Sequence, residues 1–275
     1  MWRKINNFVQ THTILSAFLL TAFFMFLSMP GGLLLMANPN MELKIGMPIF
    51  TAYQIVIAVI GIFFMRKLQV LDEGDFKFKN VGKGLVLGWL VYILMAIVVL
   101  TSFSNRSEYF IKPEPLFLLT VVLFPFSTGL LEEVIFRGLL LKILLRKTGN
   151  TKKGIISAFI ISATFFAAVH SVHLFWTTPI EVTADLIFAM AGGMLLGAVY
   201  LRTKTLVAPI LLHGLLNLSG IIFTAFTSPD YTPAGATFDD VIIMLIVAVP
   251  LIITAFVLLR KVKPEEITRE SSYAK

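Results

Sequence analysis

The sequence predicts an all-α fold, a polytopic transmembrane helical bundle of about eight spans. Of the 275 residues, 57% are hydrophobic and only 14% are charged, whereas soluble domains carry roughly 25% charged residues. Apolar runs long enough to cross a bilayer recur from one end of the chain to the other. We therefore expect a single membrane domain over residues 1–275, and not a soluble domain with one anchor.

The apolar runs define the expected spans in order. The first follows the basic residues Arg3 and Lys4, but its length and the lack of an Ala-x-Ala site after it favour a retained span over a cleaved signal peptide. Pro125 predicts a kink in the fourth, and Gly193 and Gly197 allow close helix contact in the sixth. The spans are expected at 13–36, 48–65, 84–103, 116–147, 154–174, 184–201, 210–227 and 241–259.

The connections are short and polar. Residues 142–147 at the end of the fourth span are amphipathic, which predicts a position at the cytosolic interface. Residues 148–153 form a turn, and 176–183 are expected to be a loop. Eight spans place both termini on one side of the membrane.

The distribution of basic residues agrees with this map. The side that carries both termini holds 19 of the 23 lysines and arginines, whereas the other side holds only Lys44, Arg106 and Lys112, and Arg137 lies within a span. Cytosolic loops carry an excess of Lys and Arg, so we expect cytosolic N- and C-termini. The 19 are Arg3, Lys4, Arg66, Lys67, Lys77, Lys79, Lys83, Lys142, Arg146, Lys147, Lys152, Lys153, Arg202, Lys204, Arg260, Lys261, Lys263, Arg269 and Lys275.

Composition also narrows the function classes. The chain has no cysteine, which excludes a thiol nucleophile, a disulfide and a cysteine-ligated metal. The net charge of +7 follows from the basic cytosolic loops, and no basic-aromatic motif for nucleic acid is present. We expect the lipid bilayer and a peptide or membrane-protein substrate as partners and no nucleic acid. The sequence makes no prediction of oligomeric state.

Three ionisable residues stand within the apolar run of the fourth span. Glu133 and Arg137 are spaced i,i+4 and share a helix face, so they can form a buried pair that lowers the cost of inserting both. Glu132 lies about 100° around the helix from Glu133. Glu132 is therefore the carboxylate that remains for chemistry, since an ionisable residue within a membrane is a functional-site hypothesis by default.

Other polar side chains recur in later spans. Phe166 and His170 are one turn apart in the fifth span, and His213 and Asn217 are one turn apart in the seventh. Counting helical rise from the turn at 148–153 places Glu132 and His170 at matched heights. His213 is only nine residues past Lys204, which makes it roughly 10 Å shallower unless the 202–209 connection dips into the protein or the helices tilt.

A carboxylate and two histidines in an apolar cavity suit peptide hydrolysis. Glu132 can deprotonate a water, His170 can orient that water or bind a metal, and His213 and Asn217 can donate to the oxyanion. Structural alternatives are a purely stabilising Glu133–Arg137 pair and histidines that only join helices, and a proton-coupled transporter is a further class. A zinc His-Glu-x-x-His helix, an aspartyl motif and a serine motif within a span are all missing from the sequence.

These motifs resemble those of the CPBP family, which contains CAAX prenyl endopeptidases and bacteriocin-processing or immunity proteins, also called Abi proteins. The matching pieces are Glu132-Glu133-x-x-x-Arg137-Gly138, Phe166-x-x-x-His170 and His213-x-x-x-Asn217. The segment from Gly193 to Pro209 is also similar, so the resemblance covers a catalytic core of about 115–220.

The resemblance implies a multi-pass intramembrane endopeptidase of the bacterial plasma membrane. Its catalytic residues would be Glu132, His170, His213 and Asn217, with Glu133, Arg137 and Phe166 in support. No cofactor is predicted with certainty, and Zn²⁺, if bound, would be held by Glu132, His170 and His213. The alternative that the resemblance leaves open is a non-proteolytic bacteriocin-immunity or regulatory protein on the same scaffold.

Overall fold

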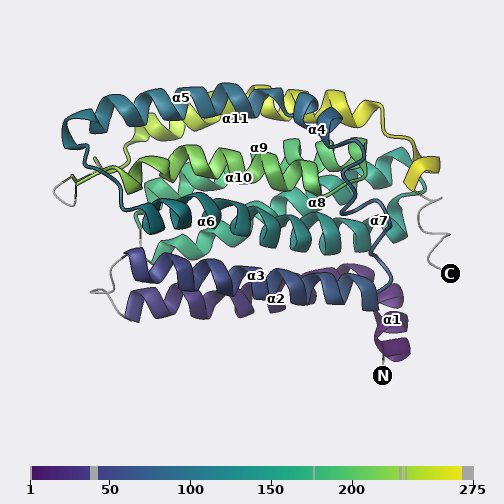
Figure 1. Cartoon of the computed structure of the whole chain (residues 1–275). Coiled ribbons are helices and arrows are strands. Elements are labelled where there is room, and N and C mark those ends of the chain that lie inside the picture. The colour runs from purple at the N-terminus through teal and green to yellow at the C-terminus, as the bar shows by residue number, and fades with distance from the viewer. Residues whose placement is uncertain (1, 38–42, 176, 229–230, 233, 268–275) are drawn as a thin grey trace.

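A computed structural model of the chain describes residues 2–37, 43–175, 177–228, 231–232 and 234–267 (Figure 1). The described residues form long helices joined by short connections, as the apolar runs predict. The elements are α1 (Trp2–Thr11), α2 (Thr13–Ala37), α3 (Leu43–Lys67), α4 (Val81–Leu87), α5 (Trp89–Arg106), η1 (Ser107–Tyr109), α6 (Pro115–Glu133), η2 (Val134–Leu141), α7 (Lys142–Thr148), α8 (Lys152–Val169), η3 (His170–Phe175), α9 (Pro179–Thr203), α10 (Val207–Ile221), η4 (Ile222–Ala225) and α11 (Phe238–Arg260).

The predicted polytopic helical bundle is confirmed. Within the described residues, seven helical segments are long and apolar enough to cross a membrane, and α1 with the first part of α2 forms an eighth that is bent by 118°. These eight correspond to the eight expected spans. Figure 1 shows α1 and the segment after α11 at the same end of the bundle, as an even number of crossings requires.

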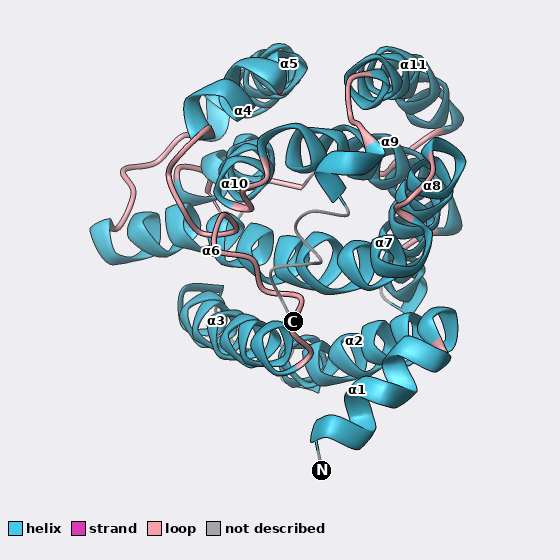
Figure 2. Cartoon of the chain, turned by 90° about the vertical axis from the view of Figure 1, so that its right-hand side faces the viewer, coloured by secondary structure: helices cyan, strands magenta, loops and turns pink. Residues whose placement is uncertain are grey.

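The helices that carry the predicted site lie at the centre of the bundle. Helix α6 packs between α3 and α10, and α9 packs between α8 and α11 (Figure 2). Helix α5 covers the outer face of α10. The C-terminal half of α6, η2, the start of α7 and the C-terminal half of α9 are therefore shielded by other helices, and the fully buried side chains include Arg137.

Glycines set how closely α10 approaches its neighbours. A Cβ on Gly214 would lie 2.3 Å from Phe126 Cδ1, and one on Gly129 would lie 3.0 Å from the carbonyl oxygen of Ile210. On the other side of α10, a Cβ on Gly88 would lie 2.3 Å from Leu212 Cδ1. Larger residues at Gly129 or Gly214 would push α10 away from α6, which carries the candidate carboxylates, and a larger residue at Gly88 would collide with α10 from its other side.

The helix of the sixth span begins earlier than the hydrophobic pattern predicts. The expected loop 176–183 is wrong from Pro179 onward, because α9 already starts there. Thr178 and Glu181 form a capping box, and proline is favoured in the first turn of a helix. Helix-start signals in the polar segment thus extended the helix beyond its apolar part.

Lys142, the first residue of the segment expected at the cytosolic interface, is buried within the protein. Its ammonium group donates to the carboxylates of Asp72 and Asp75 and to the carbonyl of Val70, at 2.5–2.7 Å. Tyr200 on α9 donates to Asp75 Oδ1 at 3.1 Å. We call Asp72, Asp75, Lys142 and Tyr200 the end cluster. The amphipathic pattern was real, but its charge meets a loop of the protein and not the lipid headgroups.

Candidate active site

The buried ion pair predicted from the i,i+4 spacing is present. Arg137 Nη1 donates to Glu133 Oε1 at 2.6 Å, and the two side chains are 1% and 0% exposed. Arg137 Nη2 donates to the carbonyl of Gly193 on α9 at 2.7 Å. A Cβ on Gly193 would lie 2.8 Å from Phe166 Cδ1. Because Gly193 has no side chain, Phe166 and Arg137 can both approach the backbone of α9 there. The pair therefore also fixes α6 against α9.

The helix changes its hydrogen-bonding pattern directly after Glu133. Residues Val134–Leu141 form the π-helix η2, a form that occurs mostly as short insertions and often at functional sites. The buried hydroxyl of Ser162 on α8 donates to the carbonyl of Phe136 at 2.9 Å, which supplies a partner from outside the helix. The segment that carries the carboxylates and Arg137 is thus held by α8 as well as by α9.

His213 reaches the depth of the two carboxylates. Its Nδ1 lies 2.9 Å from Glu133 Oε1, and its Nε2 lies 3.5 Å from Glu132 Oε2. Because a carboxylate accepts, Nδ1 carries a proton in the contact with Glu133. We call Glu132, Glu133, Arg137 and His213 the central cluster. It contains two carboxylates, one guanidinium and one imidazole, from α6, η2 and α10.

The connection before α10 explains this depth. Thr203, Thr205 and Leu206 are at most 1% exposed, and the backbone N–H of Leu206 donates to the carbonyl of Asp75 at 2.7 Å. The connection between α9 and α10 therefore enters the protein against the 72–77 loop. Of the two explanations left open by helical rise, the dip of this connection is the one that the buried residues support.

Glu132 is the incompletely satisfied member of the central cluster. Its side chain is 24% exposed, yet Oε2 is buried and has no hydrogen-bond partner among the described residues. Glu133 Oε2 is also unpartnered, but its other oxygen accepts from Arg137 and His213. Buried polar atoms without partners are rare in native proteins, so Glu132 Oε2 is the atom most in need of a further ligand or water.

Phe166 joins His170 to the central cluster. The Arg137 guanidinium carbon lies 4.7 Å from the centre of the Phe166 ring, and the His170 and His213 rings lie 5.1 and 5.8 Å from it. Among the described residues no hydrogen bond, ion pair or ring contact joins His170 directly to Glu132. Phe166 thus spaces the two histidines and stacks with Arg137.

The tautomer of His170 follows from its hydrogen bond. Helix α8 ends at Val169, and the capping N–H groups bond to the carbonyls of Ala167 and Ala168. The carbonyl of Phe166 is then available, and His170 Nδ1 lies 2.8 Å from it. Because a carbonyl only accepts, Nδ1 carries the proton and Nε2 of the neutral ring keeps its lone pair.

Asn217 occupies the next turn of α10 after His213, as predicted, and its side chain is partly buried. No side-chain hydrogen bond of Asn217 occurs within the described part of the chain. Its place in the site therefore rests on its i,i+4 spacing from His213.

The predicted zinc ligands do not form a metal site. In the described residues no group of three or more His, Asp or Glu side chains is arranged to hold a metal ion. His213 uses Nδ1 for Glu133, and His170 meets the cluster only through Phe166. A catalytic zinc needs three converging protein ligands, which Glu132, His170 and His213 do not supply in this arrangement.

Sequence reasoning missed two contacts. It gave Glu133 a single partner, Arg137, whereas Glu133 Oε1 also binds His213. It flagged Gly193 only for close packing, but the Gly193 carbonyl is a ligand of Arg137. Spacing along one helix reveals partners within that helix, and both missed contacts come from other helices.

Comparison with known proteins supports the motif reading of this region. Residues 114–219 match the family model described as type II CAAX prenyl endopeptidase Rce1-like. No curated protein and no solved structure matches the chain. The matched segment begins just before α6 and ends within α10, so it contains every residue of the central cluster together with Phe166, His170 and Asn217.

Proposed function

Since residues 114–219 match the model of the type II CAAX prenyl endopeptidase Rce1-like family, we propose that this integral multi-pass membrane protein is a CAAX-protease-like intramembrane endopeptidase. Its substrate is a peptide or protein that enters the bundle from the membrane or the cytosol. The plasma membrane of a bacterium is the proposed location.

Glu132 acts as the general base in this proposal. Its carboxylate takes a proton from a water molecule, and the hydroxide attacks the carbonyl carbon of the scissile peptide bond. When the tetrahedral intermediate collapses, the proton held by Glu132 passes to the leaving amine. One water is consumed, the C–N bond breaks, and a carboxylic acid and an amine are released, between which the acid proton then passes to give a carboxylate and an ammonium group.

His170 orients the attacking water. With Nδ1 donating to the carbonyl of Phe166, the lone pair on Nε2 can accept one hydrogen of the water while Glu132 accepts the other. The backbone hydrogen bond fixes the ring, so the water needs no further ordering by flexible groups.

His213 and Asn217 stabilise the oxyanion. A His213 with protons on both nitrogens donates Nδ1–H to Glu133 and keeps Nε2–H for the developing oxygen. With this protonation the central cluster holds two negative and two positive charges, which meets the requirement that buried charges be balanced. Asn217 Nδ2, one turn along α10, is the second donor.

The observation that carries the proposal is the buried Oε2 of Glu132, which accepts no hydrogen bond within the described part of the chain, beside a paired Glu133. The test uses the purified full-length protein in proteoliposomes, incubated with a peptide library that contains farnesylated and unmodified CAAX-type sequences. Mass spectrometry identifies the products. We expect cleavage by the wild type, and loss of cleavage in Glu132→Ala and His170→Ala with unchanged thermal unfolding.

The matched control is Glu108→Ala, because Glu108 is an exposed carboxylate outside the family segment. It should cleave as the wild type does. Unchanged cleavage by Glu132→Ala would refute the proposed base. Chelator treatment provides a separate readout: the proposed mechanism expects no loss of rate, whereas loss restored by added Zn²⁺ would replace the water-activation step by a metal-dependent one.

A further inference from the structure

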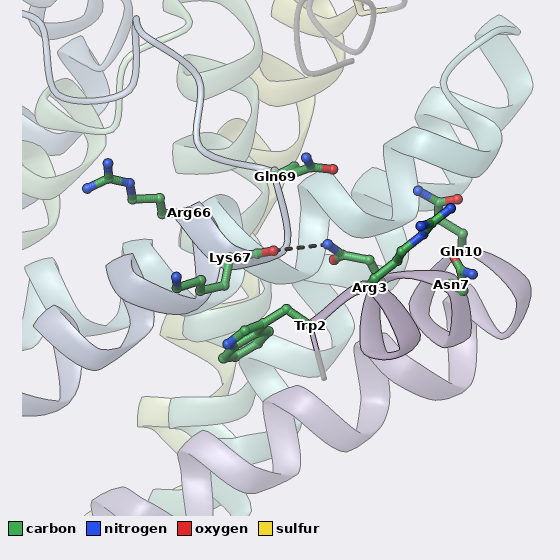
Figure 3. Close-up of a pocket in the computed structure, with 8 residues that line it drawn as sticks. Trp2, Arg3, Asn7, Gln10, Arg66, Lys67 and Gln69 are labelled. Atoms are coloured by element: carbon green, nitrogen blue, oxygen red, sulfur yellow. Dashed lines mark hydrogen bonds between the residues drawn. The ribbon is translucent and has the colours of Figure 1, made fainter.

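A pocket of about 490 Å³ lies away from the candidate active site, between α1 and the C-terminal end of α3 (Figure 3). None of the active-site candidates lines it. Its lining comes from one face of α1 and from the last residues of α3 with the first residues after it, namely Trp2, Arg3, Asn6, Asn7, Gln10, Arg66, Lys67 and Gln69.

The first helix presents a polar face to this pocket. Arg3, Asn6, Asn7 and Gln10 follow the i, i+3, i+4, i+7 spacing of one helix side. The apolar residues Ile5 and Phe8 lie elsewhere on α1 and are exposed. A basic amphipathic helix with exposed apolar side chains is typical of a segment that lies in the membrane interface.

The direction of α1 agrees with an interfacial position. It is bent by 118° from the following helix, so it turns away from the axis of the bundle and projects from its end, below α2 (Figure 1). This is the end to which the basic connections of the chain belong. The pocket therefore opens where the headgroups of the adjoining leaflet would lie.

Contacts hold the two sides of the pocket together. The amide of Asn6 donates to the carbonyl of Lys67 at 3.1 Å, the hydrogen bond drawn in Figure 3. The Trp2 ring packs edge-on against Phe63 and Phe64, with centroids 5.8 and 5.6 Å away. The pocket therefore lies between α1 and α3, which contact each other directly.

The charge of the pocket has one sign. Arg3, Arg66 and Lys67 contribute three cations, and no carboxylate is among the lining residues. Within the described residues none of these three cations forms an ion pair with an acidic group. The remaining lining side chains are amides and one indole, which donate hydrogen bonds. Such a set of donors fits the oxygens of a phosphate group.

We propose that this pocket binds a phosphate-bearing anion, and that the headgroup of an anionic phospholipid is its source. Ile5 and Phe8, exposed on the side of α1 opposite the pocket, would contact acyl chains. The exposed side chains of Arg3, Arg66 and Lys67 would hold the phosphate. Binding would anchor α1 to the leaflet at this end of the bundle. This inference does not depend on the proposed peptidase activity.

The test is native mass spectrometry of the purified full-length protein in detergent, titrated with phosphatidylglycerol or with phosphatidylcholine. The pocket variant is Arg3→Gln/Arg66→Gln/Lys67→Gln. The matched control, Lys79→Gln/Lys147→Gln/Lys153→Gln, removes the same charge from three exposed lysines outside the pocket. Each Lys or Arg near an anionic surface strengthens binding about fivefold, so the pocket variant should bind phosphatidylglycerol on the order of 100-fold more weakly.

Each outcome of the lipid titration supports or overturns the proposal. Preferential binding of phosphatidylglycerol that is lost in the pocket variant and kept in the control supports the proposal. If inorganic phosphate displaces the lipid, the site binds phosphate but its source is soluble, and the lipid assignment is overturned. Equal binding of both lipids, or equal loss in the two triple variants, overturns the site itself. Unchanged thermal unfolding of the pocket variant verifies that its fold is intact.

Discussion

The end cluster and the central cluster are both buried groups of charges, but only the end cluster is saturated. The three hydrogens of the Lys142 ammonium meet three acceptors, and both oxygens of Asp75 accept hydrogen bonds. In the central cluster one oxygen each of Glu132 and Glu133 is buried with no hydrogen-bond partner among the described residues. The two clusters therefore differ in how completely their polar atoms are satisfied, and not in how charged they are.

This difference separates structure from chemistry. A saturated cluster can only hold its elements together, and the end cluster joins residues 70–75 to α7 and α9. An unsaturated buried carboxylate has capacity for another molecule, since its lone pairs lack donors. We therefore expect substitutions in the end cluster to change stability and those at Glu132 to change activity.

The largest expected effect is that of Glu132→Gln on cleavage. The amide has nearly the same shape but cannot take a proton from water, and a general base contributes about 10²–10⁴-fold in rate. We expect a rate loss in this range with little change in thermal unfolding. Reporter-peptide cleavage and unfolding are measured on the same preparation. A loss of rate that merely parallels a loss of folded protein would remove Glu132 from the chemistry.

Arg137→Met should have the largest effect on stability. It leaves Glu133 buried without its main partner, and breaking a buried pair costs about 3–5 kcal/mol. The double variant Glu133→Gln/Arg137→Met removes the stranded charge and should recover part of this loss. Cleavage should not recover with it, because His213 also loses the Glu133 carboxylate that holds its Nδ1. Denaturant unfolding in detergent and cleavage assays follow the two properties separately.

Asp75→Asn should have a smaller effect on stability. Lys142 keeps Asp72 and the Val70 carbonyl as acceptors, so the loss is that of a weakened buried contact, about 1–3 kcal/mol. Cleavage per folded molecule should stay at the wild-type level. The control is Asp239→Asn, an exposed aspartate of α11, which should match the wild type in both assays. A selective loss of cleavage in Asp75→Asn would extend the active site to the end cluster.

The smallest expected effect is a pH dependence of stability. Burial raises the pKa of the Asp75 carboxyl above its usual range, while Lys142 acts in the opposite direction. Between the ordinary value of about 3.9 and the raised one, the folded protein binds more protons than the unfolded chain. The free energy of unfolding should then fall as pH rises through this window. Unfolding measured over a pH series should show a weaker fall in Asp75→Asn, and an identical fall would assign it to other groups.

The fold was predictable from sequence because apolar runs report directly on membrane crossings. All eight expected spans have a helical counterpart. The start of α9 was missed because hydropathy ignores the capping box at Thr178 and Glu181. The partners of Lys142 were missed because an amphipathic pattern states that a charge needs polar surroundings, but not that the 72–75 loop supplies them.

The candidate site was predictable where its contacts lie within one helix. The Glu133–Arg137 pair follows from i,i+4 spacing. The depth of His213 did not follow, because counting helical rise assumes that a connection lies at the membrane surface, and Thr205 and Leu206 are buried. The shared oxygen of Glu133 was out of reach for the same reason, since His213 comes from a helix 80 residues along the chain. The catalytic roles of Glu132, His170, His213 and Asn217 stay predictions.

The most direct test compares Glu132→Gln and Asp75→Asn in one cleavage assay. Both substitutions convert a buried or half-buried carboxylate of a charged cluster into an amide, and both proteins are reconstituted at equal folded concentration with the same substrate peptide. The account predicts that Asp75→Asn cleaves at the wild-type rate and that Glu132→Gln is slowed by at least about 100-fold. Cleavage by Glu132→Gln at the wild-type rate would contradict it.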